Sequence, residues 1–402
     1  MRIALMTNNY KPFIGGVPIS VERLSQELVR QGHQVTVFAP TYEEQKAEEN
    51  VFRYSSFRKK VLGGVTLPNP FDRRIEKEFS RQKFDVIHVH HPMLIGKTAV
   101  YLSRKYKVPL AFTYHTRYEQ YLNTFAGTDV LEPFVPMYLR SFLKHCDIIF
   151  TPTKGLQEYL KTTCRVPAHK LEILPTGLTE ESYLNDEEKT LWIRRKYKVE
   201  NCPLFLTVSR ISPEKNIEFL IESLSLVKKQ CKKPFRWILV GEGPEMARYQ
   251  EKCRELQLED EVSFVGKVSN EQIAPYFHAA DAFLFASKTE TQGIVILEAF
   301  AGKTPVYALN ATGVSDLVVN GENGYLTEEN VSEYAAGIVD FLNGKADLER
   351  LSRGAYKSAL EYREEAVAIQ AVRLYNRIIA ADSGCKILRI EGRQWRTTNI
   401  TF

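Results

Sequence analysis

The chain has 402 residues, of which 44% are hydrophobic and 26% charged, and six scattered cysteines without a close pair. This composition is typical of a globular protein of two or three domains and argues against a disulfide framework. No run approaches the roughly 18 apolar residues that a membrane-spanning helix needs, and the N-terminus lacks the features of a signal peptide, so we expect a cytoplasmic protein, soluble or peripheral to a membrane.

The first half of the chain alternates short apolar runs with amphipathic segments. Arg2–Thr7 is an apolar run, and a helical pattern follows it that ends at Gly32, a residue suited to a helix terminus. Further strands are predicted at Gln34–Pro40, Asp85–His91, Pro109–His115, Asp147–Pro152 and Lys170–Pro175, with a helix over Leu94–Lys105. Strands that alternate with helices predict a parallel sheet covered on both faces.

The second half repeats this alternation. After a charged stretch over Glu180–Lys198, which we expect to be a surface helix, five more strands alternate with helices over Asn216–Gln230, Glu245–Leu256, Asn270–Ala279 and Gly293–Ala301. Ser332–Ala381 is helical in pattern. The sequence therefore predicts an α/β protein with two Rossmann-like domains, spanning residues 1–178 and 179–360, with a helix over about 361–381 and a tail over 382–402 of no assigned role.

Positive charge is concentrated in the first half. Residues up to Pro175 include 25 Lys and Arg against 16 Asp and Glu, whereas the remainder has 29 against 33. Val51–Gln82 alone has eight basic and three acidic residues. A basic surface attracts an anionic membrane, nucleic acid or a phosphorylated substrate, although a solvated face explains it equally well.

In doubly wound folds, ligands bind beyond the carboxyl ends of the strands. After the first strand, Gly15 and Gly16 precede a helix, where the backbone can approach an anion closely. A flexible turn is the alternative. The sequence lacks the G-x-G-x-x-G pattern at this loop, which argues against a dinucleotide oxidoreductase.

Histidines occupy the ends of two neighbouring predicted strands. His115 ends one of them, which places it for polar contact with a substrate, and His88, His90 and His91 end the other. A buried structural histidine is the alternative for each. The spacing of the three clustered histidines is not that of a metal site, so no metal is expected.

Two further loops carry charge at predicted strand ends. Arg210 and Lys215 follow one strand, where two cations would bind a diphosphate and offset the charge of a leaving group. Glu290 precedes a helix that opens near Gly293, and Glu298 lies within that helix. The helix start can bind phosphate, and the two carboxylates can accept hydrogen bonds from hydroxyl groups.

Taken together, these segments resemble the retaining glycosyltransferases of family 4, which have the GT-B fold. The similarity runs from Met1 to about Tyr375, and its most specific part is the combination of SRISPEKN, VGEGP, VGKVSNEQI and ETQGIVILE, the last carrying the family's two glutamates. The fold implied is two Rossmann-like domains that face each other across a cleft.

The resemblance implies a role for each candidate residue. Arg210 and Lys215 would bind the donor diphosphate, Glu298 the ribose, and Glu290 the donor sugar. His115 would lie beside the transferred sugar. The remaining donor-binding positions would be Gly16, Val268 beside the uracil, Thr291, Gln292, Gly293 and Ile294. No protein nucleophile is expected, because the acceptor would attack from the face that the diphosphate leaves, and the diphosphate would help to take its proton. No metal or cofactor is expected.

Two segments are most similar to the diacylglycerol glucosyltransferases, which form membrane glycolipids from a UDP-sugar. They are residues 88–121 and SKTETQGIVILEA, in which ETQG stands where many members have E-G-F-G or E-S-F-G. The function implied is transfer of a hexose, with glucose favoured, to a lipid such as diacylglycerol. Phe52–Lys60 and Tyr118–Lys144 are the expected contacts with an anionic membrane; an ordinary buried helix is the alternative for the second.

Other functions fit the same fold. The acceptor could instead be a soluble or polyprenyl-linked sugar. A GT-B epimerase or phosphorylase and a non-catalytic binder are further alternatives; a phosphorylase needs a cofactor-bearing lysine, of which the sequence gives no signal. No nucleic-acid partner is expected, because no aromatic and basic RNA-binding motif is evident.

Overall fold

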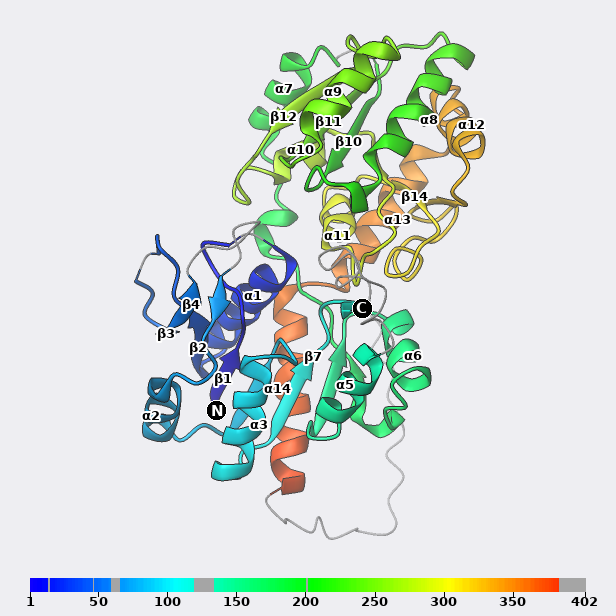
Figure 1. Ribbon diagram of the computed structural model, residues 1–402. Coiled ribbons are helices and arrows are strands. Elements are labelled where there is room, and N and C mark those ends of the chain that lie inside the picture. Colours follow the sequence, from blue (N-terminus) through cyan, green and yellow to red (C-terminus); the bar gives the residue numbers. More distant parts are fainter. Residues whose placement is uncertain (14, 46, 59–65, 119–133, 200–201, 383–402) are drawn as a thin grey trace, which may run out of the picture.

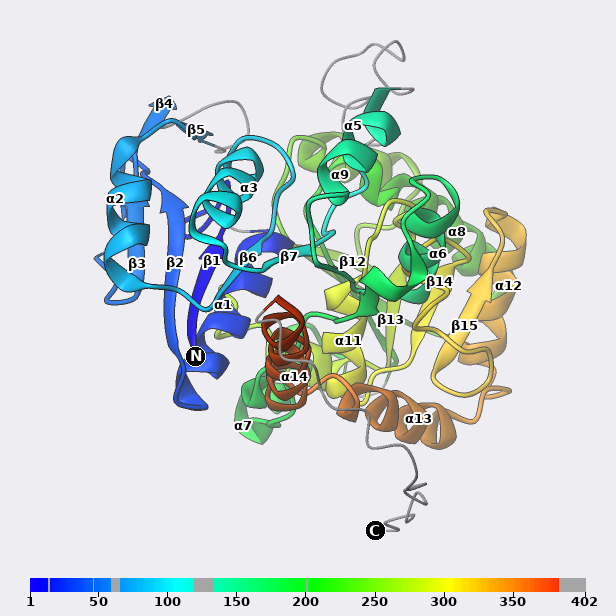
Figure 2. The same ribbon diagram turned by 90° about the horizontal axis from the view of Figure 1, so that it is seen from below.

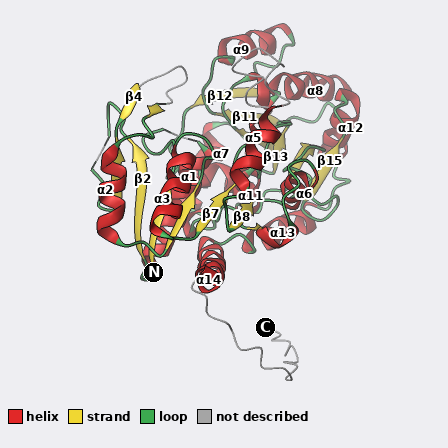
Figure 3. Ribbon diagram, turned by 60° about the horizontal axis from the view of Figure 1, so that its bottom comes forward, coloured by secondary structure: helices red, strands yellow, loops and turns green. Residues whose placement is uncertain are grey.

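The computed structural model describes the chain except for residues 14, 46, 59–65, 119–133, 200–201 and 383–402. It contains two parallel sheets, one in each half of the chain, each with helices packed against it (Figures 1 and 3). Among the described residues, no helix combines the length and the apolar character needed to cross a bilayer.

The first sheet has seven strands in the order β3-β2-β1-β6-β7-β8-β9. Its strands are β1 (Arg2–Met6), β2 (Gln34–Pro40), β3 (Val51–Tyr54), β6 (Val86–Val89), β7 (Leu110–Thr113), β8 (Ile148–Thr151) and β9 (Leu171–Ile173). The helices beside them are α1 (Gly16–Arg30), α2 (Arg73–Gln82), α3 (Ile95–Tyr106), α5 (Phe134–Leu143) and α6 (Lys154–Thr162). A small antiparallel pair, β4 (Ser56–Arg58) and β5 (Leu67–Pro68), lies outside the sheet, and a 3₁₀ turn, η3 (Ala168–Lys170), precedes β9.

The second sheet has six strands in the order β12-β11-β10-β13-β14-β15. Its strands are β10 (Leu204–Val208), β11 (Arg236–Val240), β12 (Val262–Gly266), β13 (Ala282–Phe285), β14 (Val306–Leu309) and β15 (Gly324–Thr327). The helices are α7 (Glu187–Lys196), α8 (Ile217–Gln230), α9 (Met246–Glu255), α10 (Ala274–Ala279), α11 (Ile294–Ala301), α12 (Val331–Leu342) and α13 (Leu348–Leu360), with 3₁₀ turns η4 (Glu180–Ser182) and η5 (Pro213–Lys215).

In both sheets the strand order reverses at one internal position. The chain starts in the middle of each sheet, builds toward one edge, and then crosses back to the other side of its first strand. The reversal falls between β1 and β6 in the first sheet and between β10 and β13 in the second. Such switch points open a crevice at the carboxyl ends of the strands, where ligands of doubly wound folds bind.

The last helix returns to the first sheet. In α14 (Glu364–Asp382), residues including Ala368, Ala371 and Tyr375 are buried in one hydrophobic cluster with β1 and α1. Figure 2 shows this helix, coloured red, beside α1. The chain passes between the two halves at two segments, around Leu178 and around Tyr362–Glu364, which we call the crossing segments. They pair with each other: Leu178 N–H donates to Tyr362 O (2.6 Å), and Glu364 N–H donates to Leu178 O (3.0 Å). The chain thus crosses twice between the halves, side by side.

Most predicted elements are present with bounds shifted by a few residues. The charged stretch over Glu180–Lys198 is not one helix, because Asp186 accepts a hydrogen bond from Lys189 N–H and starts α7 only at Glu187. Val29, which the sequence pattern places on one helical face with Val21 and Leu28, is 38% exposed. The sequence analysis missed α2, α6, β3, β4, β5 and β15, which are short or charged.

Candidate active site

The loop after β1 leads into α1 with an uncapped start. Gly15 is the N-cap of α1, no side chain caps the helix, and its first turn contains no acidic residue. The first N–H groups of the helix are therefore available to an anion. Gly16 is exposed, and a Cβ built on it would lie 3.9 Å from the Ile294 Cδ1 atom of α11. The start of α1 thus reaches the second half of the chain at the start of another helix.

That second helix is also uncapped. Gly293, the N-cap of α11, has φ +69°, and a Cβ on it would lie 3.1 Å from Ile296 Cδ1, so glycine fits this position best. The first turn of α11 carries no acidic residue and no side-chain cap. The helix follows β13, at the switch point of the second sheet. Two helix N-termini therefore meet where the two halves of the chain come together.

Cations and a carboxylate lie at the same switch point. Lys215, in η5 after β10, contacts Glu290 with Nζ 2.5 Å from Oε1, and the two side chains are 21% and 17% exposed. Burial raises the pKa of Glu290, but the charge and hydrogen bond of Lys215, with a hydrogen bond from Ser287, lower it overall below the ordinary value. Glu290 is therefore ionised at neutral pH. Arg210 is exposed, and its side chain has no partner among the described residues.

His115 belongs to a row of imidazoles at the carboxyl ends of β6 and β7. His90 Nδ1 lies 2.8 Å from His115 Nε2, and the two rings stack with centroids 5.1 Å apart. The His88 ring lies against that of His90 with centroids 4.2 Å apart and planes tilted by 34°, and its nitrogens bond Tyr375 Oη of α14 and Thr113 Oγ1, at 2.6 Å each. Burial lowers the pKa of His115 well below its ordinary value, aided by the neighbouring His91 and His88. His115 is therefore neutral at pH 7.

The surroundings of His90 favour one tautomer of His115. Within the part of the chain that the structure describes, His90 Nε2 is buried without a partner. Because a buried N–H without a partner is rarer than a buried lone pair without one, His90 is expected to carry its proton on Nδ1 and donate it to His115 Nε2. His115 then carries its own proton on Nδ1, where it can donate to a hydroxyl of a bound molecule.

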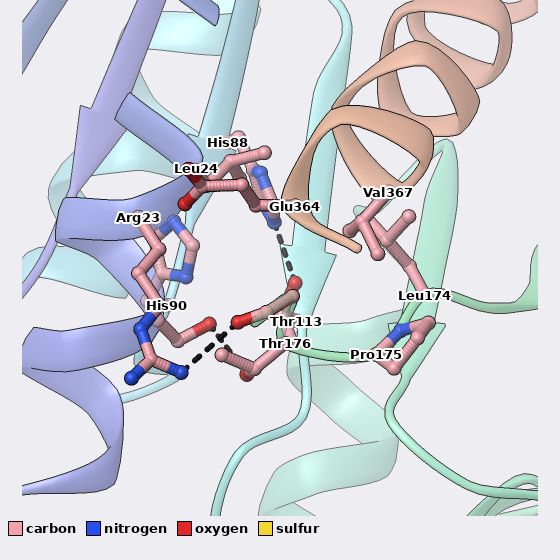
Figure 4. Close-up of a pocket in the computed structure, with 12 residues that line it drawn as sticks. Arg23, Leu24, His88, His90, Thr113, Leu174, Pro175, Thr176, Glu364 and Val367 are labelled. Atoms are coloured by element: carbon pink, nitrogen blue, oxygen red, sulfur yellow. Dashed lines mark hydrogen bonds between the residues drawn. The ribbon is translucent and has the colours of Figure 1, made fainter. Parts of the chain in front are cut away.

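A small cavity lies behind this row. His88, His90 and Thr113 line it together with Arg23 and Thr176 (Figure 4). The centre of a water molecule can move through about 20 Å³ of it, which is space for about one water. The cavity thus brings the histidine row against α1 and the segment that joins the two halves.

Glu298, one turn into α11, already has a partner from the other half of the chain. Arg23 of α1 places Nη2 2.8 Å from Glu298 Oε1 and donates from Nη1 to Gly177 O at 3.0 Å. Gln292 is also committed, because its side chain accepts from Thr176 N–H (2.8 Å) and donates to Thr176 O (3.0 Å). The side chain of Gln292 therefore supports the loop, and only its backbone is offered to a ligand.

The other predicted residues flank this centre. Thr291 accepts a hydrogen bond from Thr153 Oγ1 of the first half at 3.4 Å, which again joins the two halves. Val268 is half-buried just after β12, and Lys267 beside it is exposed. Ile294 is half-buried at the start of α11. These residues thus follow strands of the second sheet, and Thr291 and Ile294 lie beside residues of the first half.

Sequence reasoning missed four contributors, Ser20, Arg23, Thr176 and the pairing role of His90. One signal existed for the first two: Gly16, Ser20 and Arg23 are spaced by four and three residues, so they share a face of α1. The partners on the other side lie far away in the sequence, and no spacing could reveal them.

The assembled crevice suits an anionic ligand that also carries hydroxyl groups. Two cations and two free helix starts attract negative charge, whereas Glu290, Glu298 and the His115 N–H offer acceptors and a donor to hydroxyls. No group in this set is arranged as a nucleophile with an adjacent base.

Comparison with protein families assigns both halves. Residues 14–182 match the Glycosyltransferase Family 4 model, and residues 188–358 match the model of Glycosyl transferases group 1. The two matched ranges meet close to the pair of crossing segments.

Among known proteins, the alpha-monoglucosyldiacylglycerol synthase of Streptococcus pneumoniae is 31% identical over 331 residues, covering 79% of this chain and 73% of that protein. The synthase of the same name from Acholeplasma laidlawii is 28% identical over 393 residues, covering 93% and 96%. Relatives of lower identity are named for the transfer of mannose or N-acetylglucosamine.

Among solved structures, Anabaena HepE in complex with UDP-glucose superposes with a TM-score of 0.72 at 19% identity, covering 94% of this chain and all of that one. At this identity the likeness concerns the fold alone. Together with the family matches, it confirms the GT-B fold that the sequence predicts.

Proposed function

This chain belongs to the glycosyltransferases of the GT-B fold that match the family 4 and group 1 models, and from that premise we propose that it transfers glucose from UDP-glucose to a diacylglycerol lipid with retention of configuration. The observation that carries the proposal is the meeting of two uncapped helix starts, α1 and α11, with Lys215 at the cleft.

This arrangement fits the diphosphate of a nucleotide sugar. Arg210 and Lys215 supply positive charge, and the N–H groups of the two helix starts supply donors. When the sugar–phosphate bond breaks, negative charge grows on the diphosphate, and fixed cations lower the energy of that transition state. We propose that these groups serve in place of a metal ion.

The sugar and the nucleoside would lie on either side of the diphosphate. Glu290, ionised and held by Lys215, accepts hydrogen bonds from sugar hydroxyls. Glu298 accepts from the ribose, and the backbone beside Val268 meets the uracil. His115, neutral with its Nδ1 proton facing a ligand, donates to a sugar hydroxyl instead of acting as a base at neutral pH.

Retention requires no protein nucleophile in this proposal. The acceptor hydroxyl attacks from the face that the diphosphate leaves, and a diphosphate oxygen takes its proton. The UDP-sugar donor is α-linked, and the two relatives named above are described as alpha synthases, which supports retention.

A lipid acceptor is supported by those relatives and by the surface of the first half. Phe57 and Phe71 are 59% and 82% exposed, and basic Arg58, Arg73 and Arg74 lie close to them in the sequence. Exposed rings beside cations suit the interface of an anionic membrane, with the protein peripheral on the cytoplasmic face.

The second segment predicted to contact a membrane, Tyr118–Lys144, is described only in part. In α5, Leu139 and Phe142 are buried and Met137 is 63% exposed, so this part is mainly an ordinary core helix. Phe125 and Leu131, and part of the first segment at Lys59 and Lys60, lie outside the described residues.

The deciding experiment measures UDP release from UDP-glucose with and without diacylglycerol in anionic lipid micelles. Lipid-dependent release with formation of a glycolipid is expected, and chelation with EDTA should leave the rate unchanged. Donor hydrolysis without lipid stimulation would keep the transferase and direct the search to soluble or polyprenyl-linked acceptors. Absence of turnover with every acceptor would favour the non-catalytic alternative.

A further inference from the structure

We propose that Arg23 is a positioning residue that holds the Glu298 carboxylate in the orientation required by the ribose of the donor, so that one half of the protein prepares the nucleotide site of the other. This inference rests on the proposed function, since it assumes a nucleoside diphosphate at the cleft. It assigns a role to a residue outside the set that the sequence singles out.

The contacts of Arg23 span three parts of the chain. Arg23 lies on α1, and its two terminal nitrogens bond Glu298 of α11 at 2.8 Å and the carbonyl of Gly177, in the segment joining the halves, at 3.0 Å. The side chains of Arg23 and Glu298 are only 11% and 17% exposed. A guanidinium that makes two directed bonds at low exposure is fixed in direction, unlike a solvated surface arginine.

The face of α1 that carries Arg23 is itself anchored. One turn earlier, Thr176 Oγ1 donates to Ser20 Oγ at 2.9 Å, and the backbone of Thr176 is held by the Gln292 side chain. One more turn earlier, Gly16 meets Ile294. Three successive contacts therefore align α1 with α11, and Arg23 is the last of the series. This alignment gives the ion pair a defined geometry.

Glu298 retains a free acceptor in this geometry. Arg23 bonds Oε1, and no described residue bonds Oε2. A carboxylate can accept at both oxygens, so a ribose hydroxyl can bind Oε2 while Arg23 remains on Oε1. Because the carboxylate is already oriented, less side-chain freedom is lost when the nucleotide binds.

The alternative is that the Arg23–Glu298 ion pair only links the two halves of the protein and has no effect on ribose recognition. The two roles differ in one measurable quantity, the preference for a nucleotide with ribose hydroxyls. If Arg23 acts through Glu298, its loss lowers this preference and leaves affinity for a nucleotide without the hydroxyls unchanged. If Arg23 only ties the halves, both nucleotides weaken alike.

The test compares the Kd of UDP and 2′,3′-dideoxy-UDP by titration calorimetry on the full chain. Wild-type protein should prefer UDP about tenfold, the equivalent of one hydrogen bond to a charged group. Arg23→Gln should reduce the preference to about twofold, mainly by weakening UDP. Arg23→Lys keeps the charge but cannot bond both partners, so its preference for UDP should lie between those of the wild type and Arg23→Gln.

Arg30→Gln is the matched control. Arg30 lies two turns further along α1, also forms an ion pair that reaches another segment, with Glu364 at 2.7 Å, and loses the same charge. The preference of the Arg30→Gln variant for UDP over 2′,3′-dideoxy-UDP should equal that of the wild type. In a double-mutant cycle, Arg23→Gln added to Glu298→Gln should lower the preference no further, because both act on one contact.

Thermal melting of every variant shows whether it is folded, and Arg23→Lys serves if Arg23→Gln is not. A folded Arg23 variant that keeps the wild-type preference overturns the assignment while leaving the proposed function intact. A wild-type protein that binds UDP with no preference for the ribose hydroxyls overturns it as well. Failure of the wild type to bind any UDP overturns the proposed function and this inference together.

Discussion

At the scale of single residues, the centre of the site is an ion pair between groups 75 positions apart. Lys215 and Glu290 are both partly shielded from water, so their attraction is stronger than that of an exposed pair. Each side chain also keeps the other in place when no ligand is bound. A donor that enters the cleft would meet a cation and a carboxylate already at fixed positions.

Loss of either partner should therefore remove most of the turnover. We expect Lys215→Ala and Glu290→Ala each to lower kcat by about 100-fold or more, as removal of one fixed charge-stabilising group does. Lys288→Ala is the control, because Lys288 forms a similar pair with Glu329 at 2.8 Å but is exposed. Wild-type turnover in either folded site variant would contradict the assignment.

The buried histidines give a second prediction at this scale, on stability against pH. Burial lowers the pKa of His88 and His91 to about 3, and that of His90 well below the ordinary 6.5. As the pH falls below 6.5, the unfolded chain gains protons that the folded protein does not bind, so the folded state loses stability.

With His115, whose pKa burial also lowers, four such histidines contribute, and the loss approaches about 5 kcal/mol per pH unit once the unfolded groups are protonated. Melting temperatures measured from pH 7.5 down to 5 should stay level above 7 and fall with increasing slope below 6.5. This range lies above the ordinary pKa of carboxylates, so the histidines dominate it. A melting temperature that stays constant down to pH 5 would contradict the pKa directions.

At the scale of elements, the starts of α1 and α11 each offer several backbone N–H donors, which no single side chain of the site provides. Neither α1 nor α11 has a side-chain cap or an acidic residue in its first turn, which leaves backbone N–H groups free toward the cleft. Most helices avoid such an end or cap it, and α6, α7 and α12 of this protein do have caps. The starts of α9 and α10 also lack a side-chain cap and an acidic first turn, so what distinguishes α1 and α11 is that their uncapped starts lie beside each other at the contact between the two halves.

The start of α11 can be tested at Gly293. Gly293→Ala places a Cβ at φ +69° and 3.1 Å from Ile296 Cδ1, which should cost about 1–2 kcal/mol of stability and shift the first turn. Gly344→Ala is the matched control, with φ +75° and nothing within 4 Å of the added Cβ. Both variants should lose stability, but only Gly293→Ala should raise the KM for the donor. Equal donor kinetics in the two variants would argue against a backbone site at α11.

At the scale of the whole molecule, the halves are joined by two neighbouring crossings and by the α1–α11 contacts. Gly177 lies so close to Glu364 that a Cβ on it would come within 2.5 Å of the Glu364 Cα atom. The crossings are thus tightly packed, whereas the remaining bonds between the halves are single hydrogen bonds and ion pairs. Such contacts can break and re-form while the crossings stay together.

We therefore expect the two halves to close on the donor, because the site takes residues from both. Small-angle X-ray scattering should show a smaller radius of gyration with UDP-glucose than without it. The control is the Glu290→Ala variant with a saturating concentration of UDP-glucose, because this variant can bind the donor but lacks the carboxylate that contacts its sugar. Identical scattering curves for the wild type with and without donor would count against closure.

The sequence by itself determined the fold and predicted a site at the strand ends. Buried parallel strands require continuous apolar runs, and the carboxyl ends of such strands share one edge, so Gly16, Arg210, Lys215 and Glu290 could be expected at a crevice. The match of both halves to glycosyltransferase models agrees with the predicted fold. The sequence did not predict short strands such as β15 or the capped start of α7, because a pattern of only a few residues is too weak to identify.

Only the tertiary structure decided which of these residues touch and what supports them. Arg23 meets Glu298 across 275 positions, Thr176 meets Gln292 across 116, and His90 meets His115 across 25. Hydrophobic periodicity reports which face of an element is buried, but it contains no information on which other element covers that face. Contacts between the two halves depend on how the sheets are placed relative to each other, and that placement follows from the packing of the complete chain.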